Sequence, residues 1–377
     1  MKVGLPKEIK SQEYRVGLTP EGVSELVNRG HEVFVQTLAG AGIDATDDAY
    51  EQAGAKILPD ADSVFSRARL IVKVKEPQAQ ERARLTPEHI LFTYLHLAPD
   101  QAQTRDLIDS GATCIAYETI TDDHGRLPLL RPMSQVAGRL SVQAGAQSLE
   151  HKHGGRGLLL GGVPGVPPAK IAVLGGGVVG ENAILIALGM GAEVTVLDRN
   201  PDVLERLSQR FGPILKTVFS TRDSLEKVVL ESDLVIGAVL VTGAGAPKLV
   251  TREMVSGMKK GSVLVDVAID QGGCFETSEP TTHADPTFKV DGVVHYCVAN
   301  MPGAVPRTAT LALTNATLPY IIRLADEGWR EALRADPLLR QGLNVAAGRI
   351  TCRPVARSQG LEWSDPRSML GNPTANE

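Results

Sequence analysis

The stretch from Lys170 to Asn200 limits the possible folds of this chain more than any other. It opens on KIAVL, an apolar and β-branched run typical of a buried strand, and a second such run, EVTVL, occupies Glu193 to Leu197. Between them, apolar residues recur on one helical stripe, namely Ala183, Ile184, Ala187 and Leu188. A strand, a helix and a second strand within about thirty residues predict a βαβ unit of a parallel sheet.

Three glycines join the first strand to the helix with the spacing G-x-G-x-x-G. In a dinucleotide site Gly175 allows the tight turn, Gly177 lets a pyrophosphate approach the backbone, and Gly180 lets the helix pack closely on the strand. The N–H groups and the dipole at the helix N-terminus favour the negative charge. In a chain with 38 glycines the spacing also fits a βα turn that binds nothing, but the flanking strands and the acid that ends the second favour the dinucleotide site.

Asp198 is the acid that ends the second strand. It is placed to accept hydrogen bonds from the adenosine ribose hydroxyls, and a 2′-phosphate would meet a like charge there. The sequence therefore favours NAD over NADP as the cofactor. Arg199 works in the other direction, since an arginine at this point can bind a phosphate.

Length and composition favour two domains, because 377 residues exceed one small core. The net charge of −5, with no long basic run, argues against a nucleic-acid partner. The four cysteines form no C-x-x-C pair, so we expect reduced cytosolic thiols rather than disulfides or a zinc site. A predicted strand follows Met1 directly and no apolar run would span a bilayer. We therefore expect no signal peptide, no membrane contact and a cytoplasmic location.

The rest of the chain continues the alternation of strands and helices. In the first third, strands are expected at residues 2–5, 31–36, 70–74, 90–95 and 113–117, and helices at about 20–28, 47–53 and 100–110. Further strands are expected at residues 234–240, 262–267 and 293–298. Thr19 and Pro20 are the N-cap and first-turn residue types of a helix start. Repeated βαβ units predict parallel sheets covered by helices on both faces.

Two long helices flank the nucleotide-binding part, from about Ser134 to Lys152 and from Thr308 to about Glu327, the second interrupted or bent near Pro319. We therefore predict an α/β protein with two doubly wound Rossmann-like domains, joined by long helices, with a cleft between them in which ligands bind. The substrate domain would comprise residues 1–130 and 307–377, and the NAD-binding domain residues 131–306.

Several charged or titratable residues lie at the ends of predicted strands or in the loops after them: Arg15, Lys73, Lys75, His96 and Asp270. An NAD enzyme that acts on a 2-amino or 2-hydroxy acid needs such a set. Arginine binds the substrate carboxylate, a lysine stabilises charge at the C2 oxygen, and histidine exchanges the proton as hydride moves.

Each residue of this set also has a structural interpretation, and taken singly that interpretation is favoured. Arg15 can be a solvated loop charge. Lys73 and Lys75 share a face if the strand continues, and one can extend to solvent. His96 can be a structural histidine, and Asp270 a cap or turn former before two glycines. Composition alone does not select these residues.

Long segments of the chain resemble bacterial L-alanine dehydrogenases, over nearly its whole length. They are MKVGLPKEIKSQEYRVGLTPEGVSELVNRGHEV, VKVKEP, TYLHLA, RPMSQVAGRLSVQAGA, VLGGGVVGENA, DVAIDQGGCFETS, HYCVANMPGAVPRTAT and LTNATLPY. The resemblance implies that Arg15 and Lys75 bind the substrate, and that His96 and Asp270 are the catalytic residues. It implies the reversible conversion of L-alanine, NAD and water to pyruvate, ammonium and NADH, by a homohexamer.

The resemblance also implies a set of cofactor contacts beyond the glycine turn. These are Ser134, Asp198, Ser220, Val239, Leu240, Val267, Ala268, Ile269, Asp270, Val298, Ala299, Asn300 and Met301.

Some positions depart from the family pattern. The family often carries a basic residue where this chain has Val203, near the adenosine end, and an arginine where it has Glu279. Thr242 and Gly245 stand where proline and lysine are common. Some members carry a metal-linked Glu and His pair where this chain has Arg323 and Glu327, so we expect no metal.

Three alternatives remain. One is the nucleotide-binding part of proton-translocating transhydrogenase, whose branch lacks the pair of Lys75 and His96. A second is an amino-acid dehydrogenase of the lysine or saccharopine type, whose larger pocket cannot be read from one sequence. A third is an NAD-binding protein without catalysis, which would tolerate loss of the acid–base residues that are intact here.

Overall fold

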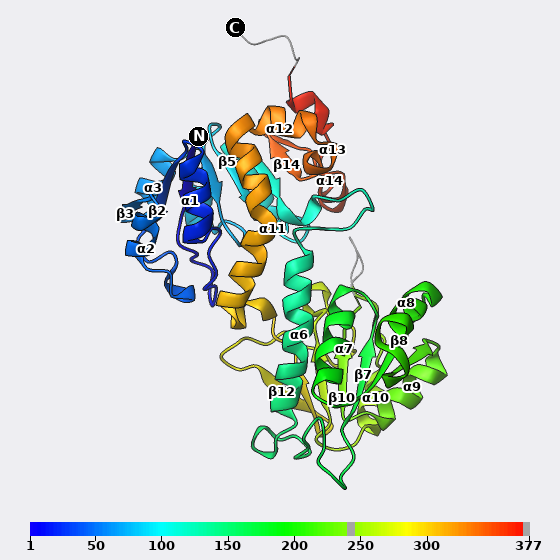
Figure 1. Ribbon diagram of the computed structural model, residues 1–377. Coiled ribbons are helices and arrows are strands. Elements are labelled where there is room, and N and C mark those ends of the chain that lie inside the picture. The colour runs from blue at the N-terminus through cyan, green and yellow to red at the C-terminus, as the bar shows by residue number, and fades with distance from the viewer. Residues whose placement is uncertain (240–245, 372–377) are drawn as a thin grey trace. The chain divides into compact units, whose positions relative to one another are not determined.

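The computed structural model describes residues 1–239 and 246–371 of the chain. The chain divides into two compact units. The first comprises Met1–Met133 together with the chain from Val305 onward, and the second comprises Ser134–Ala304. Each unit is built around a sheet of its own (Figure 1).

The described residues of the first unit form a sheet of strand order β15-β14-β6-β5-β4-β1-β2-β3. Its parallel strands are β1 (Lys2–Leu5), β2 (Glu32–Gln36), β3 (Lys56–Leu58), β4 (Leu70–Val72), β5 (Ile90–Thr93) and β6 (Thr113–Ala116). The antiparallel strands at one edge are β14 (Leu343–Ala346) and β15 (Arg349–Ile350). Counted from the N-terminus, the parallel strands follow the order 3-2-1-4-5-6 of a doubly wound sheet.

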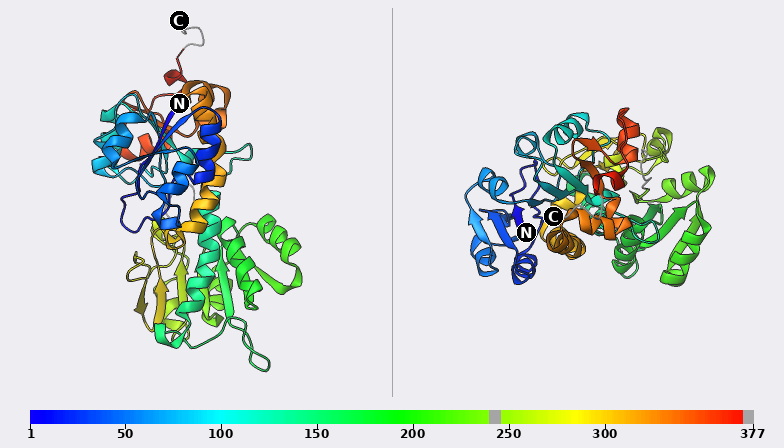
Figure 2. Two further views of the ribbon diagram at one scale, coloured as in Figure 1. Left: turned by 60° about the vertical axis from the view of Figure 1, so that its left-hand side comes forward. Right: turned by 90° about the horizontal axis from the view of Figure 1, so that it is seen from above.

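Helices join these strands and cover the sheet. The α-helices of this unit are α1 (Pro20–Asn28), α2 (Asp47–Gln52), α3 (Ala61–Arg67), α4 (Ala79–Arg82), α5 (Gln101–Ser110), α11 (Pro306–Glu327), α12 (Trp329–Ala335), α13 (Pro337–Arg340) and α14 (Arg353–Gln359). The 3-10 turns are η1 (Ala41–Ile43), η2 (Tyr117–Thr119) and η7 (Pro366–Met369). α1 packs beside α11 (Figure 2). An apolar core that includes side chains of α3, α5 and α14 lies against the sheet.

Local sequence explains where several helices begin and end. The side chain of Thr19 accepts a hydrogen bond from the backbone N–H of Gly22, and Pro20 occupies the first position of α1, as predicted. Asp100 caps α5 in the same way, and Gly111 ends that helix at a φ of 68°.

The described residues of the second unit form a sheet of strand order β12-β13-β11-β10-β7-β8-β9. Its strands are β7 (Lys170–Leu174), β8 (Glu193–Asp198), β9 (Leu215–Phe219), β10 (Leu234–Gly237), β11 (Val263–Asp266), β12 (Thr287–Val290) and β13 (Val293–Tyr296). β12 pairs antiparallel with β13, whereas the other neighbours are parallel. The parallel strands again follow the order 3-2-1-4-5-6, so the predicted pair of doubly wound sheets is confirmed.

The helices of the second unit follow the same alternation. They are α7 (Val178–Gly189), α8 (Pro201–Phe211), α9 (Arg222–Glu231) and α10 (Arg252–Gly257), with the 3-10 turns η3 (His151–His153), η4 (Gly212–Ile214), η5 (Ile269–Gln271) and η6 (Met301–Ala304). The helix α6 (Arg131–Ser148) begins in the first unit and continues into the second. All four cysteines are buried and free, as expected for reduced thiols.

The structure differs from the prediction at several element boundaries. The strand predicted to reach residue 74 ends at Val72, and the strand before Asp270 ends at Asp266, so Asp270 lies in η5 instead of at a strand end. The helix predicted over residues 134–152 begins at Arg131 and ends at Ser148. Pro319 does not interrupt α11, which is a single helix from Pro306 to Glu327.

Candidate active site

In the first unit, the predicted substrate residues lie in loops at the carboxyl ends of β1, β4 and β5. β1 and β4 are the neighbours between which the strand order reverses. Loops at this switch point leave opposite faces of the sheet, and ligands of doubly wound sheets bind in the resulting crevice. The loop after β1 carries Arg15, the segment after β4 carries Lys75, and the segment after β5 carries His96.

Arg15 is buried, with 2% of its surface exposed, so it is not a solvated loop charge. Its Nε and Nη2 atoms donate to Glu13 Oε1 and Oε2 at 2.6 and 2.5 Å, and its Nη1 donates to the sulfur of Met133 at 3.0 Å. Burial alone would lower the pKa of Arg15, but the hydrogen bonds and charge of Glu13 raise it above its usual value. The guanidinium is therefore a permanent cation held in a fixed plane.

Gly17 brings the loop of Arg15 against the end of β4. A Cβ atom at Gly17 would lie 3.0 Å from Val72 Cγ1 and 3.2 Å from the backbone nitrogen of Lys73. A side chain at this position would push the loop away from the strand end. This close approach brings Arg15 and the segment of the two lysines to the same edge of the sheet.

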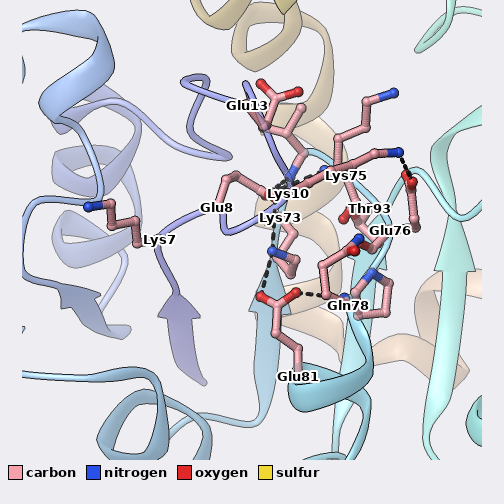
Figure 3. Close-up of polar contacts among 12 residues, drawn as sticks. Lys7, Glu8, Lys10, Glu13, Lys73, Lys75, Glu76, Gln78, Glu81 and Thr93 are labelled. Carbon is pink, nitrogen blue, oxygen red and sulfur yellow. Dashed lines mark hydrogen bonds and ion pairs between the residues drawn. The ribbon is translucent and has the colours of Figure 1, made fainter. Parts of the chain in front are cut away.

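The two lysines after β4 have different surroundings (Figure 3). Lys73 is fully buried, and its Nζ lies 2.9 Å from Glu8 Oε2 and 2.8 Å from Glu81 Oε1. Lys75 is half-buried. Lys73 therefore does not extend to solvent, because two carboxylates hold its ammonium group inside the unit.

His96 follows β5 in the left-handed region, at a φ of 49°. Its side chain is 46% exposed, and its ring stacks on that of Tyr94 at 5.7 Å with an interplanar angle of 4°. The backbone N–H groups of Leu95 and His96 both donate to Glu118, the latter at 2.6 Å. His96 is thus an exposed imidazole on an ordered support instead of a buried structural histidine.

In the second unit, the glycine turn has the geometry predicted from its spacing. Gly175 has a φ of +99°, which an L side chain rarely adopts. A Cβ atom at Gly180 would lie 1.9 Å from the carbonyl oxygen of Gly175, so the start of α7 packs directly on the turn. A Cβ atom at Gly177 would meet nothing within 4 Å. Gly177 is exposed at the N-cap of α7, where open space lies over the backbone.

Asp198 lies at the end of β8, beside this turn. Its Oδ2 atom accepts a hydrogen bond from Gly176 N at 2.7 Å, and its Oδ1 atom accepts one from Asn200 N at 2.8 Å. The methyl of Val203 packs over Gly176, where a Cβ would lie 2.5 Å away from it. The acid therefore joins the end of the second strand to the glycine turn.

The other predicted cofactor residues follow the carboxyl ends of parallel strands of the same sheet. Ser220 and Val239 follow β9 and β10, and the remaining ones follow β11 and β13, namely Val267, Ala268, Ile269, Asp270, Val298, Ala299, Asn300 and Met301. Ser134 lies in α6, one turn before Gly138, where a Cβ would lie 2.2 Å from the carbonyl oxygen of Val179 in α7. Leu240, Thr242 and Gly245 lie outside the described residues.

Sequence reasoning missed a set of carboxylates that hold these loops. Asp266, fully buried at the end of β11, accepts hydrogen bonds from Ala268 N at 3.0 Å, Cys274 N at 2.9 Å and Ser278 Oγ at 2.5 Å. It orders the loop that carries Asp270, whose own side chain is exposed. A signal was present in DVAID, since an acid at a strand end often accepts from backbone N–H groups of the following loop.

Three further features concern metal binding, the pair of Arg323 and Glu327, and membrane spanning. Among residues 1–239 and 246–371, no group of three His, Cys, Asp or Glu side chains is arranged to hold a metal ion. Arg323 and Glu327 form an ion pair at 3.4 Å. Over the same described part of the chain, no helix is both long and apolar enough to cross a membrane.

Two doubly wound sheets, one with a glycine turn at its switch point, define a two-domain Rossmann-like α/β protein. Family models match both parts of the chain, "Alanine dehydrogenase/PNT, N-terminal domain" over residues 4–137 and "Alanine dehydrogenase/PNT, C-terminal domain" over residues 141–353. The chain belongs to this alanine dehydrogenase/PNT family, and the resemblance found in its sequence is confirmed.

Individual relatives agree with this assignment. The alanine dehydrogenase of Halomonas elongata is 63% identical over 371 residues, which are 98% of this chain and 100% of that protein. A solved L-alanine dehydrogenase structure matches with a TM-score of 0.93 at 52% identity, covering 96% of this chain and 99% of that one. A transhydrogenase from Sinorhizobium meliloti matches with a TM-score of 0.81 at 26% identity, covering 94% and 99%.

Proposed function

We propose that this chain catalyses the reversible oxidative deamination of L-alanine with NAD. L-alanine, NAD⁺ and water would give pyruvate, ammonium, NADH and a proton. The observation that carries the proposal is the 63% identity with a protein named alanine dehydrogenase, over 98% of this chain and the whole of that protein. Arg15 and Lys75, in loops at the switch point of the first unit, support a small carboxylate as the substrate.

The residues of the second unit fit a dinucleotide. The open space over Gly177 and the N-terminus of α7 suit a pyrophosphate, and Asp198, which binds the glycine turn, would accept hydrogen bonds from the adenosine ribose hydroxyls. Its negative charge supports NAD over NADP. When bound, NAD supplies a hydride acceptor at its nicotinamide ring.

The residues of the first unit would hold and orient the substrate. Glu13 fixes the plane of Arg15, whose buried guanidinium would bind the substrate carboxylate. Lys75 would bind the carboxylate and the oxygen that forms at C2. A carboxylate held by two cations would also fix which face of C2 is presented.

The proposed reaction proceeds in two stages on the substrate. Loss of hydride from C2, with loss of a proton from the amino group, leaves an imine. Water adds to the imine carbon, and ammonia leaves as the C2 oxygen becomes the carbonyl of pyruvate. His96 and Asp270 would exchange the protons of these steps, and the exposed His96 ring can exchange its proton with water.

The resemblance to the family also supports a homohexamer and a cytoplasmic location, which light scattering of the purified protein and cell fractionation would test. A broader amino-acid dehydrogenase of the lysine or saccharopine type is the alternative for the substrate. A transhydrogenase-like NAD-binding protein is the alternative for the class, because that fold is shared at 26% identity.

The deciding experiment follows NADH absorbance with purified protein, L-alanine and NAD⁺ at alkaline pH. Parallel reactions contain NADP⁺ as the cofactor, or glycine, serine or lysine as the substrate. We expect turnover with L-alanine and NAD⁺ and a marked preference for both. Turnover with lysine but not alanine would favour the broader dehydrogenase, and no turnover with any amino acid would reject the proposal.

A further inference from the structure

Lys73 and Lys75 are two residues apart, yet only one of them is open to a ligand role. The ammonium group of Lys73 has no exposed surface and lies between Glu8 and Glu81. Bringing it to a substrate would break two buried ion pairs and leave two carboxylates without their cation. Lys73 therefore has a structural role, which is to hold the carboxylates of Glu8 and Glu81.

The carboxylate of Glu8 binds more than Lys73 (Figure 3). Its Oε2 atom pairs with Lys73, whereas its Oε1 atom accepts from the backbone N–H of Val74 at 2.6 Å and from that of Lys75 at 3.4 Å. Glu8 is itself buried, with 7% of its surface exposed. One side chain thus holds the side chain of Lys73 and the backbone of the next two residues.

A neighbouring strand would normally hold this backbone, but β1, the neighbour of β4 on that side, ends at Leu5. β1 pairs with β4 only at Val3–Leu70 and Gly4–Ile71, and then the chain turns away into its loop. The N–H groups of residues 74 and 75 lie beyond this ladder. Glu8, which lies in that loop, supplies the acceptor that a continuing strand would have supplied.

On its other side, the same segment forms hydrogen bonds with residues of β5, with Tyr94 and with Tyr117. The backbone of residues 73–75 donates to Phe92 O at 3.2 Å and accepts from Tyr94 N at 3.3 Å. The hydroxyl of Tyr117 donates to Lys73 O, and that of Thr93 donates to Lys75 O, both at 2.9 Å. The backbone from which the Lys75 side chain leaves is therefore fixed from both sides.

Glu81 is the second carboxylate that pairs with Lys73, and its other oxygen binds the start of α4. Its Oε1 atom pairs with Lys73, and its Oε2 atom accepts from Gln78 N at 2.8 Å, at the start of α4. Burial raises the pKa of Glu8 and is the largest influence on it, while the Lys73 charge opposes that rise. Lys73 is thus the buried cation that favours the ionised form of Glu8.

We propose that Glu8 is a positioning residue for the substrate-binding lysine. It would fix the backbone of Val74 and Lys75, with Lys73 as its buried counter-ion, and so hold the Lys75 ammonium in the orientation that binds the C2 oxygen and carboxylate. This inference rests on the proposed function, in which Lys75 binds the substrate.

The test compares Glu8→Ala and Glu8→Gln with the matched variant Glu81→Gln. Steady-state kinetics of pyruvate amination are measured with pyruvate varied at saturating NADH and ammonium, and then with NADH varied. Glu8→Ala should raise the KM for pyruvate about tenfold or more, with a smaller change in kcat, because binding to a misplaced Lys75 is lost. Glu8→Gln keeps one acceptor oxygen and should raise it less. The KM for NADH should stay within about twofold in both.

Glu81→Gln removes the same kind of charge from Lys73 but leaves the backbone of Lys75 untouched. It should lower the melting temperature as the Glu8 variants do, while the KM for pyruvate stays within about twofold of wild type. An equal rise in that KM for Glu81→Gln and Glu8→Ala would overturn the proposal, because the cluster would then support the fold alone. An unchanged KM in Glu8→Ala would overturn it as well.

A second pair of variants serves if Glu8→Ala does not fold. Thr93→Val preserves the shape of the buried side chain but removes the hydroxyl that holds Lys75 O, and Thr93→Ser keeps the hydroxyl. Thr93→Val should raise the KM for pyruvate several-fold, whereas Thr93→Ser should have a KM close to that of the wild type. Equal KM values for the two variants would reject a role for the Lys75 backbone. Absence of turnover in the wild-type protein would instead reject the proposed function, and the substrate role of Lys75 with it.

Discussion

Two glycines of the glycine turn are expected to have different roles, one in the packing of the fold and one in the binding of the cofactor. Gly177 and Gly180 lie three residues apart at the start of α7. A methyl group at Gly180 would lie 1.9 Å from Gly175 O, whereas a methyl group at Gly177 would meet no protein atom within 4 Å. Gly177→Ala should therefore affect a bound cofactor alone, and Gly180→Ala should affect both the fold and the cofactor.

The magnitudes follow from these distances. At Gly177 the backbone angles, φ −70° and ψ −165°, suit alanine. Alanine reduces the conformational entropy of the unfolded chain, which raises the free energy of unfolding by about 0.4–1 kcal/mol. Alanine is also a poorer N-cap than glycine, which lowers it, so the net change should stay within about 1 kcal/mol. At Gly180 the carbonyl of Gly175 must move by about 1 Å, and overpacking of this kind costs about 1–3 kcal/mol.

The assay is a fluorescence titration of NADH, run beside urea unfolding on the same samples. Gly177→Ala should weaken NADH binding at least about tenfold, or about 1.4 kcal/mol, since its methyl occupies the space of the pyrophosphate. Gly189→Ala is the matched control, because it lies at the far end of α7 and its Cβ also meets nothing within 4 Å. If Gly177→Ala bound NADH as tightly as Gly189→Ala does, the pyrophosphate would not lie over Gly177 and the reasoning would be refuted.

Three further outcomes are expected. His96→Asn, which tolerates the positive φ, should lower kcat about 100-fold or more while changing the unfolding free energy by only about 0.5 kcal/mol; normal turnover would make the ring structural. Asp198→Gly should lower kcat/KM with NAD relative to kcat/KM with NADP. An unchanged ratio of the two values would show that Asp198 does not bind the ribose. Burial raises the pKa of Glu76, but Lys10 and Lys75 together lower it by more, so the pKa in the folded state lies below the usual 4.5. The stabilisation that the Glu76 carboxylate gives is therefore complete above pH 4.5 and is lost as pH falls through the pKa of the folded state. Glu76→Gln should therefore lower the unfolding free energy by about 1 kcal/mol at pH 7 in urea titrations, and the difference should disappear in acid; a difference independent of pH would contradict this assignment.

Features that depend on neighbours in sequence could be predicted from the sequence. The cap at Thr19 and the glycine turn are set by residues within one or two turns of each other, so their spacing carries the information. The doubly wound class followed from repeated βαβ units, although the strands β3, β9, β12, β14 and β15 were missed. β3 has only three residues and β14 joins the sheet from the far end of the chain, so neither has a local pattern that distinguishes it.

The parts that could not be predicted depend on residues far apart in the sequence. Lys73 meets Glu8 across 65 positions, and nothing near either residue indicates the pair. The two lysines looked equivalent because both follow an apolar strand, and their difference arises from where β4 ends. The sequence around Arg15, taken alone, favours a solvated loop charge, because nothing in it indicates the approach of Gly17 to the end of β4.

The loops that carry the predicted site residues share one physical device. In the loops that carry Arg15, Lys75, His96 and Asp270, and at the glycine turn, a carboxylate accepts hydrogen bonds from backbone N–H groups; these acids are Glu13, Glu8, Glu118, Asp266 and Asp198. Beyond the end of a strand the ladder supplies no acceptors, and an unpaired buried N–H is costly. A hydrogen bond to a charged acceptor stabilises a fold by about 1.5–3 kcal/mol, which is more than a hydrogen bond to a neutral acceptor contributes. The chain thus orders these loops with charged acceptors from other segments instead of with longer strands.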